Sequence, residues 1–198
     1  MLQDTTTSRR SLLGMTGKGV LSLAAVGILA NNSAMAAMGA KGKGKKMDGG
    51  AGDVAILNTA LGLEHEAINA YQIGAESGLL PQSALDVAVK FQSQHKDHRD
   101  ALLGAIKQLG GKAVDEKSRD EYVASLNAAS IKSATDILTL AARLERGAAN
   151  AYIGVIPSFK NTAFAQVCAK LAADEATHVM FLDNALGRAI PNKGFQFG

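Results

Sequence analysis

Residues 63–71 read LEHEAINAY and residues 144–152 read LERGAANAY, so the two stretches correspond position by position at an offset of 81. Glu, Asn and Tyr occur at matching positions here, whereas two unrelated alanine-rich helices would share little beyond alanine and leucine. The segments that follow correspond at an offset of 80, which pairs Lys90, His95, His98 and Leu102 with Lys170, Glu175, His178 and Leu182. The sequence therefore predicts an internal duplication.

Four long segments with helical periodicity surround these matches, and none alternates convincingly as a strand does. Their expected bounds are 53–77, 83–110, 133–157 and 161–187. Helices of about 25 residues are about 38 Å long, which is the length of a bundle helix. The side chains expected to begin them are Asp53 as an N-cap, Ser83 with Asp86 and Ser133 with Asp136 as capping boxes, and Asn161.

Each helix carries a seam of buried positions when it is read in alternating steps of three and four residues. Every seam is apolar except at its middle, where the polar side chains are Glu64, His95, His98, Glu145, Glu175 and His178. An unpaired carboxylate costs several kcal/mol to bury. These groups therefore require compensation at one shared depth, which a bound cation would supply.

Residues 53–187 resemble the ferritin-like superfamily, the four-helix bundles of the bacterioferritin and rubrerythrin type. In that family two helices each offer one Glu and the other two each offer Glu-x-x-His, all around two metal ions. Residues 175–178 match that motif, Glu64 and Glu145 match the single glutamates, and Tyr71 and Tyr152 match tyrosines that lie beside such sites.

The resemblance implies an all-α bundle of two duplicated hairpins joined by a long crossover between the second and third helices. It also implies two divalent metal ions, with iron preferred and zinc, manganese or copper as alternatives. The expected chemistry is oxidation of ferrous iron or reduction of oxygen or peroxide, the work of a ferroxidase or peroxidase. Tyr71 and Tyr152 then either take a redox or proton role or are core residues with a satisfied hydroxyl group.

One position departs from the family pattern, because residues 95–98 read HKDH where the second Glu-x-x-His is expected. Three glutamates carry −3 where the family carries −4, and added imidazole favours zinc, copper or ferrous iron over manganese or magnesium. Three interpretations of His95 are open. It is a ligand in an altered dinuclear site, a hydrogen-bond partner beside a single metal, or part of a site that has become a neutralised polar core.

A rival function is not enzymatic. Exported ferritin-like proteins without a known activity are similar to this chain, so a periplasmic bundle that acts in stress or desiccation tolerance is the alternative, with its metal structural, mononuclear or lost. For the remaining polar and reactive side chains we expect structural roles only. His65 and Glu66 are assigned to an exposed helix face, and Cys168 to the core.

The segment between the hairpins spans about 22 residues, enough to run back along a bundle, and a short helix is expected near 116–126. Residues 188–198 form a short tail without a fifth helix, so no cage is expected. The resemblance leaves room for a homodimer.

The N-terminal region has the order of an export signal. Residues 8–13 read SRRSLL, residues 20–30 are apolar, and Ala34-Met35-Ala36 resembles a cleavage site, so 1–36 is assigned to a twin-arginine signal peptide and 37–52 to a Gly/Lys linker. Residues 1–50 hold 7 basic and 2 acidic side chains, which leaves 14 and 16 of the totals of 21 and 18 for the rest. The bundle is therefore slightly acidic, which argues against nucleic-acid binding. A periplasmic or otherwise exported protein without stable membrane insertion is expected.

Overall fold

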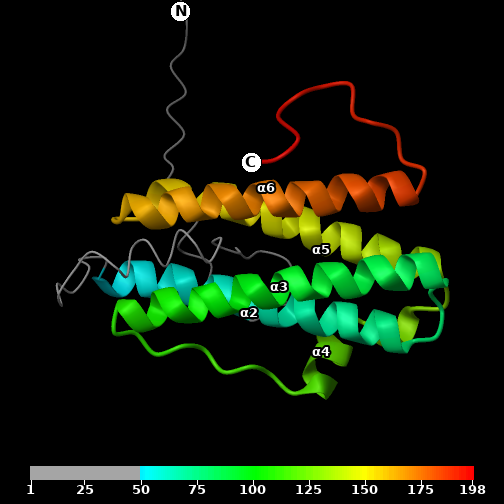
Figure 1. The fold of residues 1–198 in the computed structure, drawn as a ribbon, viewed down its shortest axis with the longest axis horizontal. Coiled ribbons are helices and arrows are strands. Elements are labelled where there is room, and N and C mark those ends of the chain that lie inside the picture. Colours follow the sequence, from blue (N-terminus) through cyan, green and yellow to red (C-terminus); the bar gives the residue numbers. More distant parts are fainter. Residues whose placement is uncertain (1–49) are drawn as a thin grey trace, which may run out of the picture.

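Four long helices run side by side in residues 50–198, the part of the chain that the computed structural model describes (Figure 1). They are α2 (Gly50–Glu76), α3 (Gln82–Gln108), α5 (Ala134–Val155) and α6 (Thr162–Ala185). α2 packs mainly on α3 and α5 mainly on α6, while α2 also contacts α5. The expected all-α bundle of two hairpins is confirmed, and no strand occurs in the described residues.

The crossover between α3 and α5 runs back along the outside of the first hairpin and carries two short helices (Figure 1). These are α4 (Arg119–Ser125) and η2 (Ala128–Ser130). A capping box begins α4, because the Glu121 N–H donates to the Ser118 hydroxyl and the Ser118 N–H donates to the Glu121 carboxylate. The short helix expected near 116–126 is thus confirmed.

Two of the four expected helix starts are wrong. Asp53 is not an N-cap, because α2 already begins at Gly50. Its buried carboxylate instead accepts from the backbone N–H groups of Lys160 (3.1 Å) and Asn161 (3.2 Å), which ties the start of α2 to the segment that precedes α6. Ser83 forms no capping box, because Pro81, with its φ fixed at −65°, is the N-cap of α3 and places Ser83 inside the helix.

The other two starts are as expected. Ser133 caps α5, since its hydroxyl accepts from the Asp136 N–H at 3.2 Å. Asn161 caps α6, since its side chain accepts from the Ala163 N–H at 2.9 Å. The turn η3 (Ile156–Ser158), which contains Pro157, follows α5, and Gly187 follows α6 with a φ of +67°.

The expectation that His65 and Glu66 face solvent is also wrong. Both side chains are buried, at 6% and 7% exposure, because the crossover covers this face of α2. The Asn69 amide donates to Glu116 at 2.7 Å, and Tyr122 of α4 is buried in the same region. Helical periodicity identifies the face toward the other long helices, but it does not show which further segment lies on the opposite side.

The apolar core is divided into two parts by a polar layer at the middle of the bundle. One part lies toward the start of α2 and is built from fully buried side chains, among them Leu57, Leu102, Phe164 and Leu171. Cys168 lies in it, as expected for a small core residue. The other part, around Tyr71, Phe91 and Leu182, lies toward the turn between α2 and α3.

The expected signal peptide, 1–36, and the linker as far as residue 49 lie outside the described residues. At the other end of the chain, the tail after α6 folds back so that the Gly198 N–H donates to Asn150 of α5 at 2.9 Å. No helix within 50–198 combines the length and apolar character that crossing a bilayer requires.

Candidate metal centre

The polar layer consists of the six side chains that the seams predict, and each is at most 5% exposed. They come from all four long helices: one Glu from α2, one Glu from α5, the two His of α3, and the Glu and His of α6. Their potential ligand atoms form two overlapping groups, within each of which all atoms lie within 4.8 Å of one another. The groups are Glu64, His95, His98 and Glu175, and His95, Glu145, Glu175 and His178.

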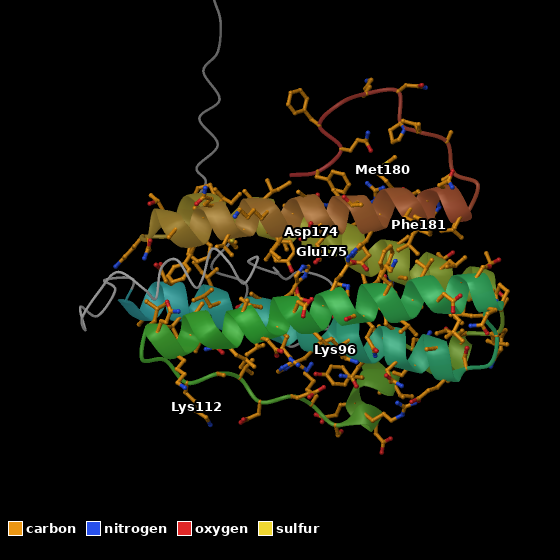
Figure 2. All side chains as sticks on the ribbon, viewed as in Figure 1. Lys96, Lys112, Asp174, Glu175, Met180 and Phe181 are labelled. Atoms are coloured by element: carbon orange, nitrogen blue, oxygen red, sulfur yellow. The ribbon has the colours of Figure 1, made fainter. Side chains whose placement is uncertain are left out.

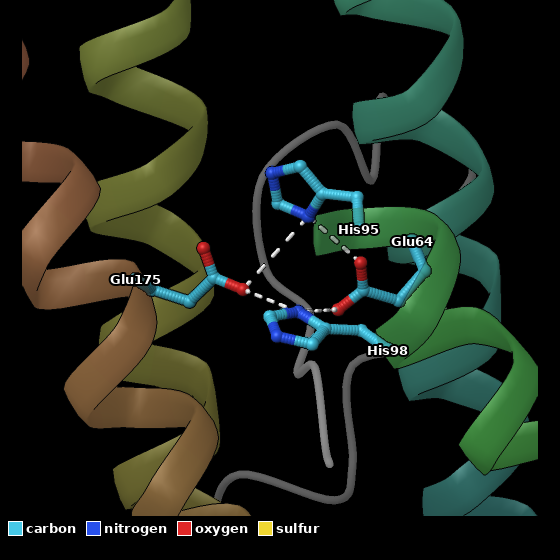
Figure 3. Close-up of side chains that lie close together, drawn as sticks. All are labelled: Glu64, His95, His98 and Glu175. Atoms are coloured by element: carbon cyan, nitrogen blue, oxygen red, sulfur yellow. Dashed lines mark hydrogen bonds and ion pairs between the residues drawn. The ribbon is translucent and has the colours of Figure 1, made fainter. Parts of the chain in front are cut away.

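The first group joins α2 and α3 to α6 (Figure 3). The Nδ1 atom of His98 lies 3.3 Å from Oε1 of Glu175 and 3.6 Å from Oε1 of Glu64. These atoms face one another across the bundle, so one carboxylate from each hairpin and one imidazole converge on a common point.

The second group repeats this arrangement on the other side of Glu175. The Nδ1 atom of His178 lies 3.4 Å from Oε1 of Glu145 and 3.2 Å from Oε2 of Glu175. Glu175 therefore presents one oxygen to His98 and the other to His178. This is the position from which a carboxylate can bridge two ions.

His95 occupies the place opposite Glu175 and also faces both groups. Its Nδ1 atom lies 2.8 Å from Oε2 of Glu64, and its Nε2 atom lies 3.2 Å from Oε1 of Glu145. Each ring nitrogen therefore contacts the single glutamate of a different hairpin. The geometry places His95 among the potential ligand atoms, while its role as a ligand stays a prediction.

Two outer partners of the histidines were not predicted. The Nε2 atom of His178 lies 2.7 Å from the Gln94 amide oxygen, and Nε2 of His98 lies 3.5 Å from the Asp174 carboxylate. Both contacts hold the imidazole so that Nδ1 faces the centre. Figure 2 labels Asp174 beside Glu175 on α6. The signal was present in the sequence, because 94 and 174 are equivalent positions at the offset of 80.

The two tyrosines cross between the hairpins. The Tyr71 hydroxyl of α2 donates to Glu145 of α5, and the Tyr152 hydroxyl of α5 donates to Glu64 of α2. Tyr152 also lies 3.4 Å from Glu175. Burial and the neighbouring carboxylates raise the pKa of both tyrosines well above its usual value, so both hydroxyls keep their protons. Each tyrosine fixes one carboxylate in the layer.

The charges in the layer compensate one another. Burial alone would raise the pKa of Glu64, but the charges of His95 and His98 lower it to about 2. Burial likewise opposes the charge on His98, yet the nearby carboxylates, first Glu64 and then Asp174 and Glu175, raise its pKa to about 12. The pKa of Glu175 is raised, first by burial and then by Glu145. Without metal, the carboxylates and imidazoles of the layer therefore share protons with one another.

For His178, burial alone would lower the pKa, but hydrogen bonds to Glu145 and Glu175 raise it to about 9. Burial opposes the charge on His95 too, and the three surrounding glutamates raise its pKa well above the usual value. Imidazolium groups thus occupy positions where a metal would bind neutral imidazole, and metal uptake must release protons.

The residues of the layer are of the kinds that can hold metal ions. Nδ1 of His98 is buried and makes no hydrogen bond although two carboxylates lie close to it. A nitrogen left in this state is costly in a folded protein, whereas a metal would satisfy it. Mixed carboxylate and imidazole ligands suit iron, zinc, manganese and copper.

The fold and this polar layer define a helical-bundle protein with a carboxylate and histidine centre that is able to hold metal. The family model described as ferritin-like domain matches residues 52–188, and the chain belongs to this family. Among solved structures, the chain is similar to a conserved hypothetical protein, rv2844, from Mycobacterium tuberculosis, with 22% sequence identity and a TM-score of 0.58. That similarity covers 74% of this chain and 98% of the other, and it supports the fold alone. No curated protein matches the chain.

Proposed function

We propose that this protein binds two divalent metal ions, iron in preference to others, and oxidises ferrous iron or reduces oxygen or peroxide with them. The observation that carries the proposal is the convergence of three buried glutamates and three buried histidines in two overlapping groups. Buried charges are retained in proteins when they are paired or bind metals.

In this proposal each hairpin supplies most of one site. Glu64 and His98 would hold one ion, Glu145 and His178 would hold the other, and Glu175 would contribute to both sites. His95 completes both sites or supports them through its contacts to Glu64 and Glu145. Three glutamates would leave two ferrous ions with a net charge of +1. Two ferric ions would leave a larger positive charge, so the ligands suit ferrous iron better than ferric iron.

Bound metal ions would supply the electrons for oxygen or peroxide. The chain holds the ligands in a fixed position, since Tyr71 and Tyr152 each orient a carboxylate, while Gln94 and Asp174 orient the two imidazoles. Apolar side chains above and below the layer exclude water and keep the interactions within it strong.

The second candidate is a non-enzymatic bundle that acts in stress or desiccation tolerance. One observation favours it: the carboxylates and imidazoles already satisfy most of one another's charge without a metal. Such a protein would fold fully without metal and gain little stability from it. The enzymatic proposal requires turnover as well as binding.

Export is the remaining part of the proposal, and it is supported by the twin-arginine pattern in residues 8–13. A folded protein with a metal loaded in the cytoplasm suits that route. Mass spectrometry of protein expressed with its own leader in a twin-arginine-competent host is expected to show cleavage after Ala36. An uncleaved chain in the cytoplasm would contradict this part.

The experiment that tests the proposed function is ferrous oxidation by anaerobically prepared protein, followed after addition of oxygen or of peroxide. The native protein is expected to oxidise iron faster than buffer, and Glu175→Gln to lose at least 90% of that rate, because the bridging carboxylate is gone. The exposed Glu116→Gln variant is the matched control and should keep the native rate. Equal rates in all three proteins would contradict the proposal.

A further inference from the structure

A cavity of about 220 Å³ lies in the half of the bundle toward the turn between α2 and α3. All four long helices line it, and Ile131 of the crossover contributes to its wall. Its lining includes the side chains of Tyr71, Leu80, Phe91, Leu138, Leu144 and Phe181. The equivalent half on the other side of the metal centre is filled by fully buried apolar side chains.

The internal duplication explains why one half is hollow. Ala84 on α3 and Phe164 on α6 are equivalent positions at the offset of 80. Phe164 is fully buried and fills its half of the bundle, whereas the methyl group of Ala84 lines the cavity. The missing ring at position 84 therefore contributes to the cavity, as do the small side chains of Gly74, Ala88 and Ala141 in its lining.

The lining offers almost nothing to water. Its polar side-chain groups are the hydroxyls of Ser83, which is exposed, and of Tyr71, whose proton is already donated to Glu145. An ordered water needs two to four polar partners, whereas a cavity of about 150 Å³ lined by apolar side chains stays dry and binds benzene. A larger apolar cavity of this kind suits a benzene ring that carries a short alkyl group.

The inner wall of the cavity touches the metal centre. The Phe91 ring stacks on the His178 imidazole with centroids 4.0 Å apart, and the Tyr71 ring lies 5.5 Å from that of His95. An occupant in contact with Phe91 and Tyr71 would thus be separated from the centre by a single layer of rings.

The cavity opens toward solvent beside Phe181 of α6. This ring is 50% exposed and packs edge-on against Phe91, with centroids 5.8 Å apart. Figure 2 labels it on α6, beyond Glu175 and toward the end of that helix. A small molecule can therefore enter from the solvent side, while the volume is too small for a helix of a protein partner.

We propose that this cavity is a binding site for a small apolar organic molecule of the size of an alkylbenzene. Such a molecule would pack against apolar side chains, with its inner end against Phe91 and Tyr71 and its outer end toward solvent. The site needs no metal, so it stands independently of the proposed oxidation chemistry.

Toluene is the probe, and its binding to the full chain is measured by calorimetry and by the rise in melting temperature. The native protein is expected to bind toluene with or without added metal. Ala84→Phe, which introduces the residue found at the equivalent position 164, is expected to weaken binding at least tenfold, because its ring occupies the cavity. Ala173→Phe on the exposed side of α6 is the matched control and should bind as the native protein does.

If Ala84→Phe does not fold, Ala141→Leu fills the same cavity with a smaller side chain and should weaken binding in the same way. Absence of toluene binding to the native protein would overturn the proposal, as would native affinity in a folded cavity-filling variant. Size-exclusion chromatography provides one further test. A native dimer that Ala84→Phe converts to a monomer would show that a second copy of the chain covers the cavity, and this too would overturn the proposal.

Discussion

The two hairpins of this bundle are copies of one unit, and they agree where the metal centre needs identical parts. Each supplies one glutamate, one tyrosine seven residues later and one histidine whose Nδ1 faces the centre. The equivalent pairs are Glu64 with Glu145, Tyr71 with Tyr152, and His98 with His178. Crossed hydrogen bonds from each tyrosine to the other hairpin's glutamate complete the symmetry.

The copies differ at two positions that matter. At the position between the two metal groups the first hairpin has His95 and the second has Glu175, and in the core the first has Ala84 where the second has Phe164. One difference changes the charge and ligands of the centre, and the other opens a cavity beside it. The duplication thus keeps the ligand framework while the two halves diverge in charge and in packing.

Removal of the Phe164 ring, which only the second hairpin has, is expected to produce the largest change in stability. Phe164→Ala makes the copies alike at this position and should lower the free energy of unfolding by about 3–5 kcal/mol, because it leaves a cavity in a filled core. Urea unfolding followed by circular dichroism measures the change.

Phe181→Ala is the matched control on the same helix and should cost about 1 kcal/mol, because that ring is half exposed. Equal losses in the two variants would show that the two halves of the core are packed alike.

Giving each hairpin the other's residue at positions 95 and 175 is expected to have the next largest effect, on metal affinity. Glu175→His removes the remaining bridge and should weaken binding of ferrous iron about a hundredfold, equal to about 2.7 kcal/mol. His95→Glu restores the second Glu-x-x-His and should tighten binding about tenfold, while the metal-free protein loses stability to the added carboxylate.

Anaerobic calorimetry measures both affinities. Affinity that falls equally in the two exchange variants would mean that His95 and Glu175 act alike and that the asymmetry of the centre has no effect on metal binding.

A smaller effect is expected from pH on the metal-free protein. Hydrogen bonds to Glu145 and Glu175 raise the pKa of His178 to about 9 despite burial, so its contribution to stability is complete below the unfolded value of 6.5. That contribution is lost as pH rises from 6.5 through 9, and we expect a decrease on the order of 2 kcal/mol over this range.

Thermal unfolding between pH 6 and pH 9.5 measures this decrease. His178→Gln should make the decrease smaller but not abolish it, because the raised pKa values of His95 and His98 still lower stability over this range. A native profile that rises with pH would contradict the assigned protonation.

The smallest effect is expected from the tyrosine pair. Tyr71→Phe and Tyr152→Phe each remove one hydroxyl that orients a carboxylate and should each cost about 1 kcal/mol of stability, with a few-fold loss of metal affinity. Equal losses would confirm that the crossed bonds are equivalent.

A larger loss at one position is the informative alternative. Tyr152 also reaches Glu175, so a greater effect at Tyr152 would indicate that its second contact matters. No change in either variant would show that the tyrosines are ordinary core residues.

The centre was predictable from the sequence because two physical regularities coincide there. Helical periodicity places Glu64, Glu145 and Glu175 on buried seams, and the cost of burying their charge requires nearby compensation. The duplication then aligns them at one depth, so their convergence follows without knowledge of the connecting segments.

Features that depend on contacts between distant segments were not predictable in the same way. Asp53 binds the backbone before α6 instead of capping its own helix, and His65 and Glu66 are covered by the crossover. Periodicity describes each helix separately and cannot show where a loop returns. The cavity was in part predictable, because Ala84 and Phe164 differ at equivalent positions.

The number of ferrous ions that the native protein binds without oxygen, counted by equilibrium dialysis and elemental analysis, tests the metal centre most directly. We predict about two ions per chain, close to none in Glu175→Gln, and full helicity in both proteins. A native protein that is fully helical and binds no ferrous ion would contradict this prediction, because the buried carboxylates and imidazoles would then serve only one another.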